Sequence, residues 1–408
     1  MHQVKKVVEN LYWVGGNDRR LALFENAFPI PRGISYNAYL LLDTKTVLFD
    51  TVDKAISEVF YENLDFVLNG RTLDYVVINH VEPDHCANLA LLVQRYPAIT
   101  IVGNKRTGSM LKQFFSFDAG KFDEHFKLIA EGDTLETGAH TLKFAMAPMV
   151  HWPEAMVTYD MTAKVLFSAD AFGTFGALNG HIFADELEFE REWLPDARRY
   201  YANIVGKYGS QVQALLAKTA KFDVSVVCPL HGPCWRKDFD WYLKKYQLWS
   251  TYKPEDAAVM IAYGSIYGHT ENAAMILAAN LAEKGVHNIK IFDASSTHVS
   301  EIVAEAFRCS HLVFASATYN GGIFCSMETL IHHLIAHNLQ NRTIAFIENG
   351  SWGLESGRLM RELCAQLKNT MLLDATVNFK SAVKEEGRVL LENLAGEICN
   401  SMAKSALE

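Results

Sequence analysis

The stretch HVEPDH at residues 80–85 places two histidines and two carboxylates within six positions. It follows the apolar run LDYVVIN at 73–79, which is typical of a buried strand. Because side chains alternate along extended chain, His80, Glu82 and Asp84 can point the same way. Few structural roles need so many ligand-type side chains so close together. The stretch therefore predicts a metal site at the end of a strand.

Three later strand ends each carry one further ligand-type side chain. His151 follows the apolar run KFAMAPMV, Asp170 ends KVLFSAD, and His231 follows VSVVCPL. Taken singly, each is more often a satisfied buried polar group than a ligand. Taken with the first stretch, they favour a metal site. The candidate ligands are His80, Glu82, Asp84, His85, His151, Asp170 and His231.

The first part of the chain alternates short β-like runs with turn signals. Continuous apolar strands that end in His or Asp indicate buried sheets with polar side chains at their ends, and we expect a two-sheet sandwich with outer helices. The expected strands span 36–43, 46–50, 73–80, 99–104, 140–148, 164–170 and 224–232, and helical patterns span 86–96 and 199–220. The polar, Pro-containing stretch STYKPED at 250–256 predicts a linker.

After this linker the pattern becomes strictly β-α-β. Five apolar strands with helical crossovers predict a parallel, doubly wound sheet. The strands are expected at 257–265, 288–295, 311–320, 342–350 and 375–379, and the helices from about 270 and at 299–308, 326–338 and 354–368. The sequence therefore predicts two domains, at residues 1–250 and 256–408.

The stretch YGSIYGHTEN at 263–272 follows the first strand of the second domain and opens its first helix. Its Ser, Gly and Thr offer N–H groups and hydroxyls to an anion at a helix N-terminus. It is not a Walker motif, and it lacks G-x-G-x-x-G, which disfavours nicotinamide. We expect Ser265, Gly268 and Thr270 to hold one phosphate. An ordinary glycine turn with a helix cap is the alternative for this stretch alone.

Two further loops, SATYNGG at 316–322 and ENGSWGLES at 348–356, lie at carboxyl ends of strands, where ligands of open parallel sheets bind. Tyr319 and Trp352 can stack on a flat ring or serve as packing residues. With the phosphate turn, the set resembles flavodoxin and favours FMN. The predicted FMN-binding residues are Ser265, Ile266, Tyr267, Gly268, His269, Thr270, Ala317, Thr318, Tyr319, Asn320, Gly321, Gly322, Asn349, Gly350, Ser351, Trp352 and Gly353.

The order and spacing of the metal motif resemble the metallo-β-lactamase superfamily, whose first motif is H-x-H-x-D-H. Glu82 stands where the hydrolases have His, and such a mixed donor set suits iron or manganese better than a dizinc site. The ligands that the resemblance implies are His80, Glu82 and His151 for the first metal, Asp84, His85 and His231 for the second, and Asp170 as the bridge. If one coordination position of the second metal stays open, His85 is the residue that would not bind the metal.

A hydrolase-like metal domain followed by a flavodoxin domain resembles the two-domain class of flavodiiron proteins over nearly the whole chain. The implied fold is α/β, a metallo-β-lactamase-like αββα sandwich followed by a flavodoxin-like doubly wound parallel sheet. The implied activity is reduction of O₂ to water, of NO to N₂O, or both, at a non-haem diiron site that receives electrons through FMN. The implied assembly is a head-to-tail homodimer or a dimer of such dimers.

Two other functions stay open at this point, namely a dizinc hydrolase with a regulatory FMN domain and a non-catalytic diiron gas sensor. No catalytic residue is assigned beyond the metal ligands. Tyr200 and Tyr201 could supply a proton near the metals, and a core role is the alternative.

Composition limits the partners and the compartment. The net charge of −9 argues against nucleic acid, and no apolar run reaches the length of a membrane span. The first residues, MHQVKKVVENLYWVGG, lack the apolar region of a signal peptide, and the cysteines are odd in number and widely spaced. We therefore expect a cytoplasmic protein. No C-x-x-C pair occurs, so we expect a separate electron donor, either rubredoxin or a reduced deazaflavin.

Overall fold

The computed structural model describes residues 2–117 and 119–405. The chain forms two compact units, the first built from residues 1–201 and 210–243 and the second from 202–209 and 244–408. The linker at 250–256 and the domain boundaries at residues 250 and 256 remain predictions from the sequence. In the described part of the chain, no helix combines the length and the apolar character that a membrane-crossing helix needs.

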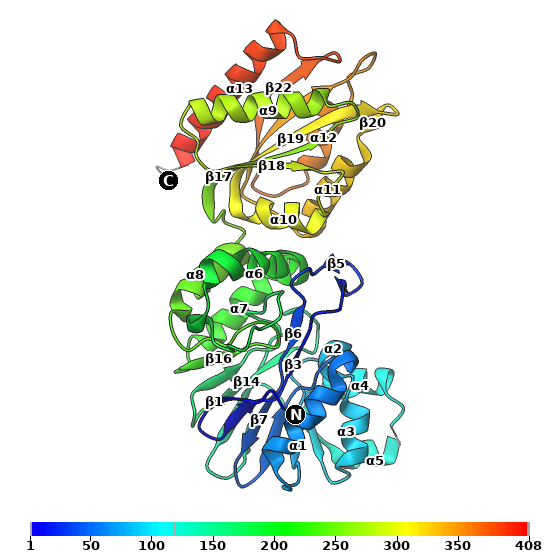
Figure 1. Ribbon diagram of the computed structural model, residues 1–408, viewed down its shortest axis with the longest axis vertical. Coiled ribbons are helices and arrows are strands. Elements are labelled where there is room, and N and C mark those ends of the chain that lie inside the picture. The colour runs from blue at the N-terminus through cyan, green and yellow to red at the C-terminus, as the bar shows by residue number, and fades with distance from the viewer. Residues whose placement is uncertain (1, 118, 406–408) are drawn as a thin grey trace. The chain divides into compact units, whose positions relative to one another are not determined.

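Two sheets face each other in the first unit (Figure 1), with strand orders β1-β2-β7-β8-β9-β10-β11 and β12-β13-β14-β15-β16. The rings of Phe49 on β8 and Phe167 on β15 stack with centroids 3.7 Å apart, so the apolar faces of the sheets meet. The strands are β1 (Lys5–Val8), β2 (Leu11–Trp13), β7 (Tyr39–Leu42), β8 (Thr46–Phe49), β9 (Tyr75–Val77), β10 (Thr100–Gly103), β11 (Phe126–Leu128), β12 (Thr134–Glu136), β13 (Thr141–Met146), β14 (Met156–Asp160), β15 (Val165–Phe167) and β16 (Val226–Cys228).

Short strands and helices complete this part of the chain. Two hairpin-like pairs join β3 (Gly16–Asp18) to β6 (Ile34–Tyr36) and β4 (Leu23–Phe24) to β5 (Phe28–Pro29). The helices are α1 (Ser57–Leu68), α2 (Pro83–Cys86), α3 (Leu89–Arg95), α4 (Lys105–Phe114), α5 (Ala119–His125), α6 (Leu194–Tyr200), α7 (Gly209–Thr219) and α8 (Phe239–Ser250). Single 3₁₀ turns lie at Lys54–Ile56, Ala184–Glu186 and Gly206–Tyr208, and π-helical stretches at Phe189–Trp193 and Tyr201–Val205.

Helix α1 shows how local sequence determines one of these elements. Phe60, Leu64 and Val67 are spaced by four and three residues, so they share one face, and all three are buried. The helix ends at Asn69, which adopts a left-handed φ of 45°, and Gly70 follows with a φ of 87°. Asn and Gly tolerate this conformation better than other residues, so they stop the helix where the chain turns toward β9.

The second unit is a parallel sheet with the strand order β18-β17-β19-β21-β22, and the short β20 pairs antiparallel with β19. Helices α9 and α13 lie on one face and α10, α11 and α12 on the other (Figure 1). The elements are β17 (Asp256–Gly264), α9 (His269–Glu283), β18 (Ile289–Asp293), α10 (Val299–Arg308), β19 (Cys309–Tyr319), β20 (Gly322–Ile323), α11 (Cys325–Ala336), β21 (Thr343–Asn349), α12 (Ser356–Cys364), β22 (Met371–Phe379) and α13 (Glu385–Ser405).

The predicted fold class is confirmed in both units. The helical pattern at 199–220 is interrupted, because a π-helical stretch and a 3₁₀ turn separate α6 from α7. A Cβ on Gly209 would lie 2.3 Å from the backbone oxygen of Ser250, so the chain approaches its neighbour too closely there for any residue but glycine. Helix α13 was not predicted.

Candidate functional site

Each of the seven predicted metal ligands follows a strand, either in a loop or, for Asp84 and His85, in the short helix α2. The segment from His80 to His85 follows β9 in the first sheet, whereas His151 lies between β13 and β14 in the second. Asp170 follows β15, and His231 follows β16. The two sheets therefore contribute to one cluster, which lies wholly in the first unit.

Extended chain ends at Glu82, and this corrects the predicted alternation of side chains. Pro83 is the first residue of α2, where its restricted φ and missing N–H are well tolerated. Asp84 and His85 therefore leave the backbone from a helical turn. As a result, Asp84 does not join His80 and Glu82 but belongs to a second group of side chains.

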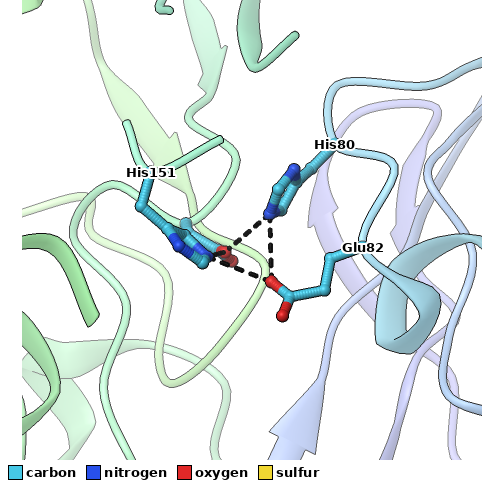
Figure 2. A group of neighbouring side chains, drawn as sticks. His80, Glu82 and His151 are labelled. Carbon is cyan, nitrogen blue, oxygen red and sulfur yellow. Dashed lines mark hydrogen bonds and ion pairs between the residues drawn. The ribbon is translucent and has the colours of Figure 1, made fainter. Parts of the chain in front are cut away.

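The first group consists of His80, Glu82, His151 and Asp170, which are all buried. Glu82 Oε2 lies 3.2 Å from His80 Nε2 and 3.0 Å from His151 Nε2. Asp170 Oδ2 lies 3.3 Å and 3.2 Å from the same two nitrogens. Figure 2 shows His80 and Glu82, from one segment of the chain, converging with His151 from another. Four candidate ligand atoms thus point toward one another.

The second group consists of Asp84, His85 and His231. Asp84 Oδ2 lies 3.3 Å from the Nε2 atom of each histidine. Asp170 reaches this group as well, with Oδ1 at 3.2 Å from His85 Nε2 and 3.7 Å from His231 Nε2. Asp170 therefore presents one oxygen to each group, which is the arrangement that a carboxylate bridge between two metal ions needs.

Several atoms of the second group are buried without hydrogen-bond partners in the described part of the chain. They are both carboxylate oxygens of Asp84, both ring nitrogens of His85, and His231 Nε2. Buried polar atoms are nearly always paired, so a cluster of this kind calls for a ligand from outside the chain. Each group offers histidine nitrogens and carboxylate oxygens, a donor set that iron accepts. The residues present therefore fit two metal ions.

Histidines and carboxylates balance each other's charge in the site. Burial alone lowers the pKa of His85, but Asp84 and Asp170 outweigh burial and raise that pKa to about 9. Burial also lowers the pKa of His151, and Asp170 and Glu82 raise it to about 9. Burial raises the pKa of Asp170, but the nearby histidines hold it well below its usual range. Asp170 is therefore ionised, as metal ligation requires.

Glu154 supports the site, although it is not among the residues predicted from the sequence. Its Oε1 lies 2.8 Å from His80 Nδ1 and accepts the N–H of Val81 at 2.8 Å. Because the carboxylate accepts a hydrogen bond from the Nδ1–H of His80, the Nε2 atom is left to face the other residues of the first group. The two partners are 74 residues apart, so no local pattern marks Glu154 as a supporting residue.

Aromatic rings pack against His231 of the second group. The ring of Phe24 meets that of His231 edge-on, with centroids 5.3 Å apart, and the ring of Tyr200 lies 5.6 Å from the same histidine. Phe175 contacts both Phe24 and Tyr200. The Tyr200 hydroxyl is buried and has no hydrogen-bond partner among the described residues. Tyr201 is also buried, in the π-helical stretch that follows α6.

A cavity of about 710 Å³ opens at the carboxyl ends of β17, β19 and β21 in the second unit. Its size suits a cofactor-sized ligand. Of the predicted FMN residues, Gly268, Tyr319 and Gly322 do not line it, whereas Glu355 and Ser381, which were not predicted, do. The predicted residues that line it are Ser265, Ile266, Tyr267, His269, Thr270, Ala317, Thr318, Asn320, Gly321, Asn349, Gly350, Ser351, Trp352 and Gly353.

Helix α9 begins at this cavity. Gly268 precedes the helix with a φ of 85°, and its N–H donates to Ser265 Oγ at 3.1 Å. The N-cap residue Gly268 has no side chain to cap the first N–H groups of α9, so they can bind an anion. Asn349 Nδ2 donates to the buried Thr270 Oγ1 at 3.3 Å, which ties two of the predicted loops together. The arrangement fits the phosphate of a flavin nucleotide.

The rim of the cavity is aromatic and tightly built. Trp352 is 96% exposed and Tyr267 is 89% exposed, so their flat faces are free to stack. Tyr319 instead packs edge-on against Phe324, with ring centroids 5.8 Å apart. A Cβ on Gly350 would lie 1.9 Å from the backbone oxygen of Gly353, so only glycine can close this loop. Two exposed aromatic side chains at the cavity can therefore stack on a flat ring.

Comparisons with known proteins point to one family. Residues 34–232 match the model of the ODP family beta lactamase. The chain is 31% identical over 397 residues to an anaerobic nitric oxide reductase flavorubredoxin of Aeromonas hydrophila, a match that covers 95% of this chain and 77% of that protein. It is 30% identical over 388 residues to an uncharacterized protein of Methanocaldococcus jannaschii, over 94% of this chain and 95% of that protein.

Solved structures point to the same family as the sequence comparisons. The rubredoxin oxygen:oxidoreductase of Desulfovibrio gigas matches with a TM-score of 0.91 and 26% identity, over 99% of this chain and 100% of that one. The flavodiiron protein of Giardia intestinalis also has a TM-score of 0.91, at 23% identity over 99% and 98% of the two chains, and supports the fold alone. On this similarity, which spans both units, the chain is an oxidoreductase that belongs to the flavodiiron protein family.

Proposed function

We propose that this protein reduces O₂ to water, NO to N₂O, or both, at a non-haem diiron site, and that FMN relays the electrons from a separate donor. Its named relatives divide between the two gases, since one is a nitric oxide reductase and another an oxygen oxidoreductase. The observation that carries the proposal is Asp170, whose two oxygens face two separate groups of ligand atoms.

When bound, two irons and reduced FMN supply the electrons that reduction of the gas requires. The residues of the first unit would hold the irons and keep them close together. Glu82 places a carboxylate where a dizinc hydrolase has an imidazole, which favours iron. The proposed ligands are His80, Glu82 and His151 for one iron, Asp84, His85 and His231 for the other, and Asp170 between them.

The residues beside the second group would bind the gas and exclude water. Phe24 and Phe175 present aromatic rings there, which suit a small neutral molecule better than an ion. Burial raises the pKa of Tyr200 well above its usual range, and Asp170 raises it further. Tyr200 therefore keeps its proton and can donate a hydrogen bond to a molecule bound beside His231.

The second unit would hold FMN with its phosphate at the start of α9 and its ring near Trp352. The electron donor would be a separate partner. Rubredoxin is our first proposal and a reduced deazaflavin the alternative. The match with the Aeromonas hydrophila flavorubredoxin leaves part of that protein uncovered, and this chain has no C-x-x-C pair of its own.

We also propose a head-to-tail homodimer, or a dimer of such dimers, in the cytoplasm. The exposed rings of Trp352 and Tyr267 at the rim of the cavity favour an interface that covers the flavin. All seven cysteines are free thiols, which fits a reducing compartment.

Anaerobic reduction followed by timed exposure to O₂ or NO tests the function. We expect protein loaded with iron and FMN to consume the gas repeatedly and to form water without released peroxide, or N₂O. A single reaction without turnover would indicate a gas sensor instead. Two zinc ions per chain after expression in iron-rich medium would contradict the diiron site and favour a dizinc hydrolase.

A further inference from the structure

His231 is the second-group ligand that regular secondary structure supports least. It lies in the loop from Pro229 to Gly232, after β16 ends. Its Nδ1 donates to the backbone oxygen of Ser35 at 2.8 Å, which leaves Nε2 to face Asp84 and Asp170. The orientation of the ring therefore depends on how the loop sits against the segment around Ser35.

That segment, residues 35–39, binds the loop at several points. The Ser35 hydroxyl accepts the N–H of Gly232 at 2.7 Å, and the Tyr39 hydroxyl donates to the Pro229 oxygen at 2.7 Å. The N–H of Asn37 donates to the Leu230 oxygen at 2.8 Å. Ser35, Asn37 and Tyr39 are each fully buried. The contacts are therefore shielded from water and hold the loop backbone in place.

The side chain of Asn37 makes the contacts that flank His231. Its Nδ2 donates to the Pro229 oxygen at 2.8 Å and to the Gly232 oxygen at 2.9 Å, on either side of the histidine. Its Oδ1 accepts the indole N–H of Trp13 at 2.9 Å. An indole nitrogen can only donate, so Oδ1 must face Trp13 and both Nδ2 hydrogens must face the loop. The orientation of the amide is thus determined by its partners.

We propose that Asn37 is a positioning residue for the second metal ion, acting through the His231 loop and held in orientation by Trp13. The proposal rests on the diiron function proposed above. In Asn37→Asp the carboxylate keeps the size of the amide but has no hydrogen to donate, so it would face two carbonyl oxygens. The loop would shift, and His231 Nε2 with it. His80, Glu82 and His151 of the first group lie on other segments and would keep their places.

Asn63 provides a matched control in the same unit. It is also fully buried, and its Nδ2 donates to the backbone oxygens of Val14 at 3.2 Å and Gly15 at 2.8 Å, while its Oδ1 accepts the N–H of Gln3 at 2.7 Å. Asn63→Asp therefore loses the same kinds of hydrogen bond, but none of them reaches a loop that carries a predicted metal ligand.

The test is Fe(II) binding by metal-free protein under anaerobic conditions, with a chromophoric chelator as competitor and Mössbauer spectra to distinguish the two irons. We expect Asn37→Asp to keep one tightly bound Fe(II) and to bind the second about 10- to 100-fold more weakly, with one of the two iron signals altered. Asn63→Asp should lower the thermal midpoint comparably while keeping both wild-type affinities. Trp13→Phe, which keeps the amide but removes its orienting donor, should weaken the second iron to a smaller extent.

The proposal would be overturned if Asn37→Asp bound both Fe(II) ions with the affinities of the wild-type protein. An equal weakening of both irons in Asn37→Asp and Asn63→Asp would overturn it as well, because that would show only a loosened fold. If Asn37→Asp did not fold, Trp13→Phe would decide the matter by the same criterion. Wild-type protein that binds fewer than two Fe(II) would contradict the diiron function itself, and the same titration with Zn(II) would then test Asn37 separately.

Discussion

Glu154 Oε1 lies 2.8 Å from His80 Nδ1, deep in the first unit, and so determines which nitrogen of the histidine faces the first metal group. A partner of this kind commonly sets the affinity of a metal site as strongly as the ligands do. The same unit contains a second buried carboxylate–histidine pair, Asp160 with His140 at 2.7 Å, which belongs to neither metal group.

We expect Glu154→Leu to weaken Fe(II) binding at the first group by about 10- to 100-fold, because His80 loses the acceptor for its Nδ1 hydrogen. Asp160→Leu removes an acceptor from His140 in the same way and should leave both iron affinities unchanged. Chelator competition on the two variants checks this. Equal weakening in both would show that only general stability is affected.

Asp170→Asn should abolish gas reduction and leave FMN bound. The amide keeps the shape of the side chain, but one of its two ends no longer offers an oxygen, so it cannot serve both groups. Turnover with a chemical reductant, measured together with flavin content, checks this prediction. Glu82→His should likewise lose gas reduction and keep FMN. Full activity in either variant would show that the ligand assignment is wrong.

Gly268→Asp should expel FMN while the iron stays bound. Gly268 has a φ of 85°, and the new carboxylate would stand at the N-terminus of α9, where we place the flavin phosphate. Gly268→Asn is the matched control, because Asn tolerates this backbone conformation and carries no charge. It should retain much more flavin than the Asp variant. Wild-type flavin content in Gly268→Asp would place the phosphate elsewhere.

Burial of His311 should make the second unit less stable in acid. Burial lowers the pKa of His311 to about 4 from the ordinary 6.5, so between these values the unfolded chain binds the proton more readily. The free energy of unfolding is therefore undiminished above pH 6.5 and falls as the pH drops toward 4, by about 3 kcal/mol at most. Urea unfolding at several pH values should show this loss, and His311→Gln should remove it.

Mixed dimers test the proposed head-to-tail assembly. Co-expression of Asp170→Asn with Gly268→Asp gives dimers in which no single chain holds both cofactors. Transfer between chains would leave one working pair in each mixed dimer, or about a quarter of normal activity if half of the dimers are mixed. Transfer within one chain predicts no activity. Isolated mixed dimers without turnover would therefore contradict the head-to-tail arrangement.

The sequence was sufficient to predict the fold class and to select the residues that form the two groups, because the candidate ligands lie at or just after the ends of apolar runs. His151, Asp170 and His231 stand out for that reason, and strand ends bring such residues to one edge of a sheet. The helical turn at Pro83 was missed because a period of two over so few residues does not distinguish extended chain from the start of a helix.

The supporting residues could not be predicted, since their roles depend on partners that are distant in the chain. Asn37 lies 195 residues from Gly232, and Glu154 lies 74 residues from His80. A buried asparagine or glutamate has no periodicity of its own, and only the folded chain shows what it contacts. The strand pairings of the first residues are equally hidden, because β3 pairs with β6 across a hairpin that contains two further strands.

The two groups of predicted metal ligands connect the two sheets of the first unit. Each group combines residues that follow a strand of one sheet with residues that follow strands of the other. An ion bound in either group would therefore act as a cross-link between the two layers of the sandwich. Ions that bind only the folded chain raise its stability in proportion to the logarithm of their concentration. Iron supply would then determine how long the first unit survives in the cell as well as whether it is active.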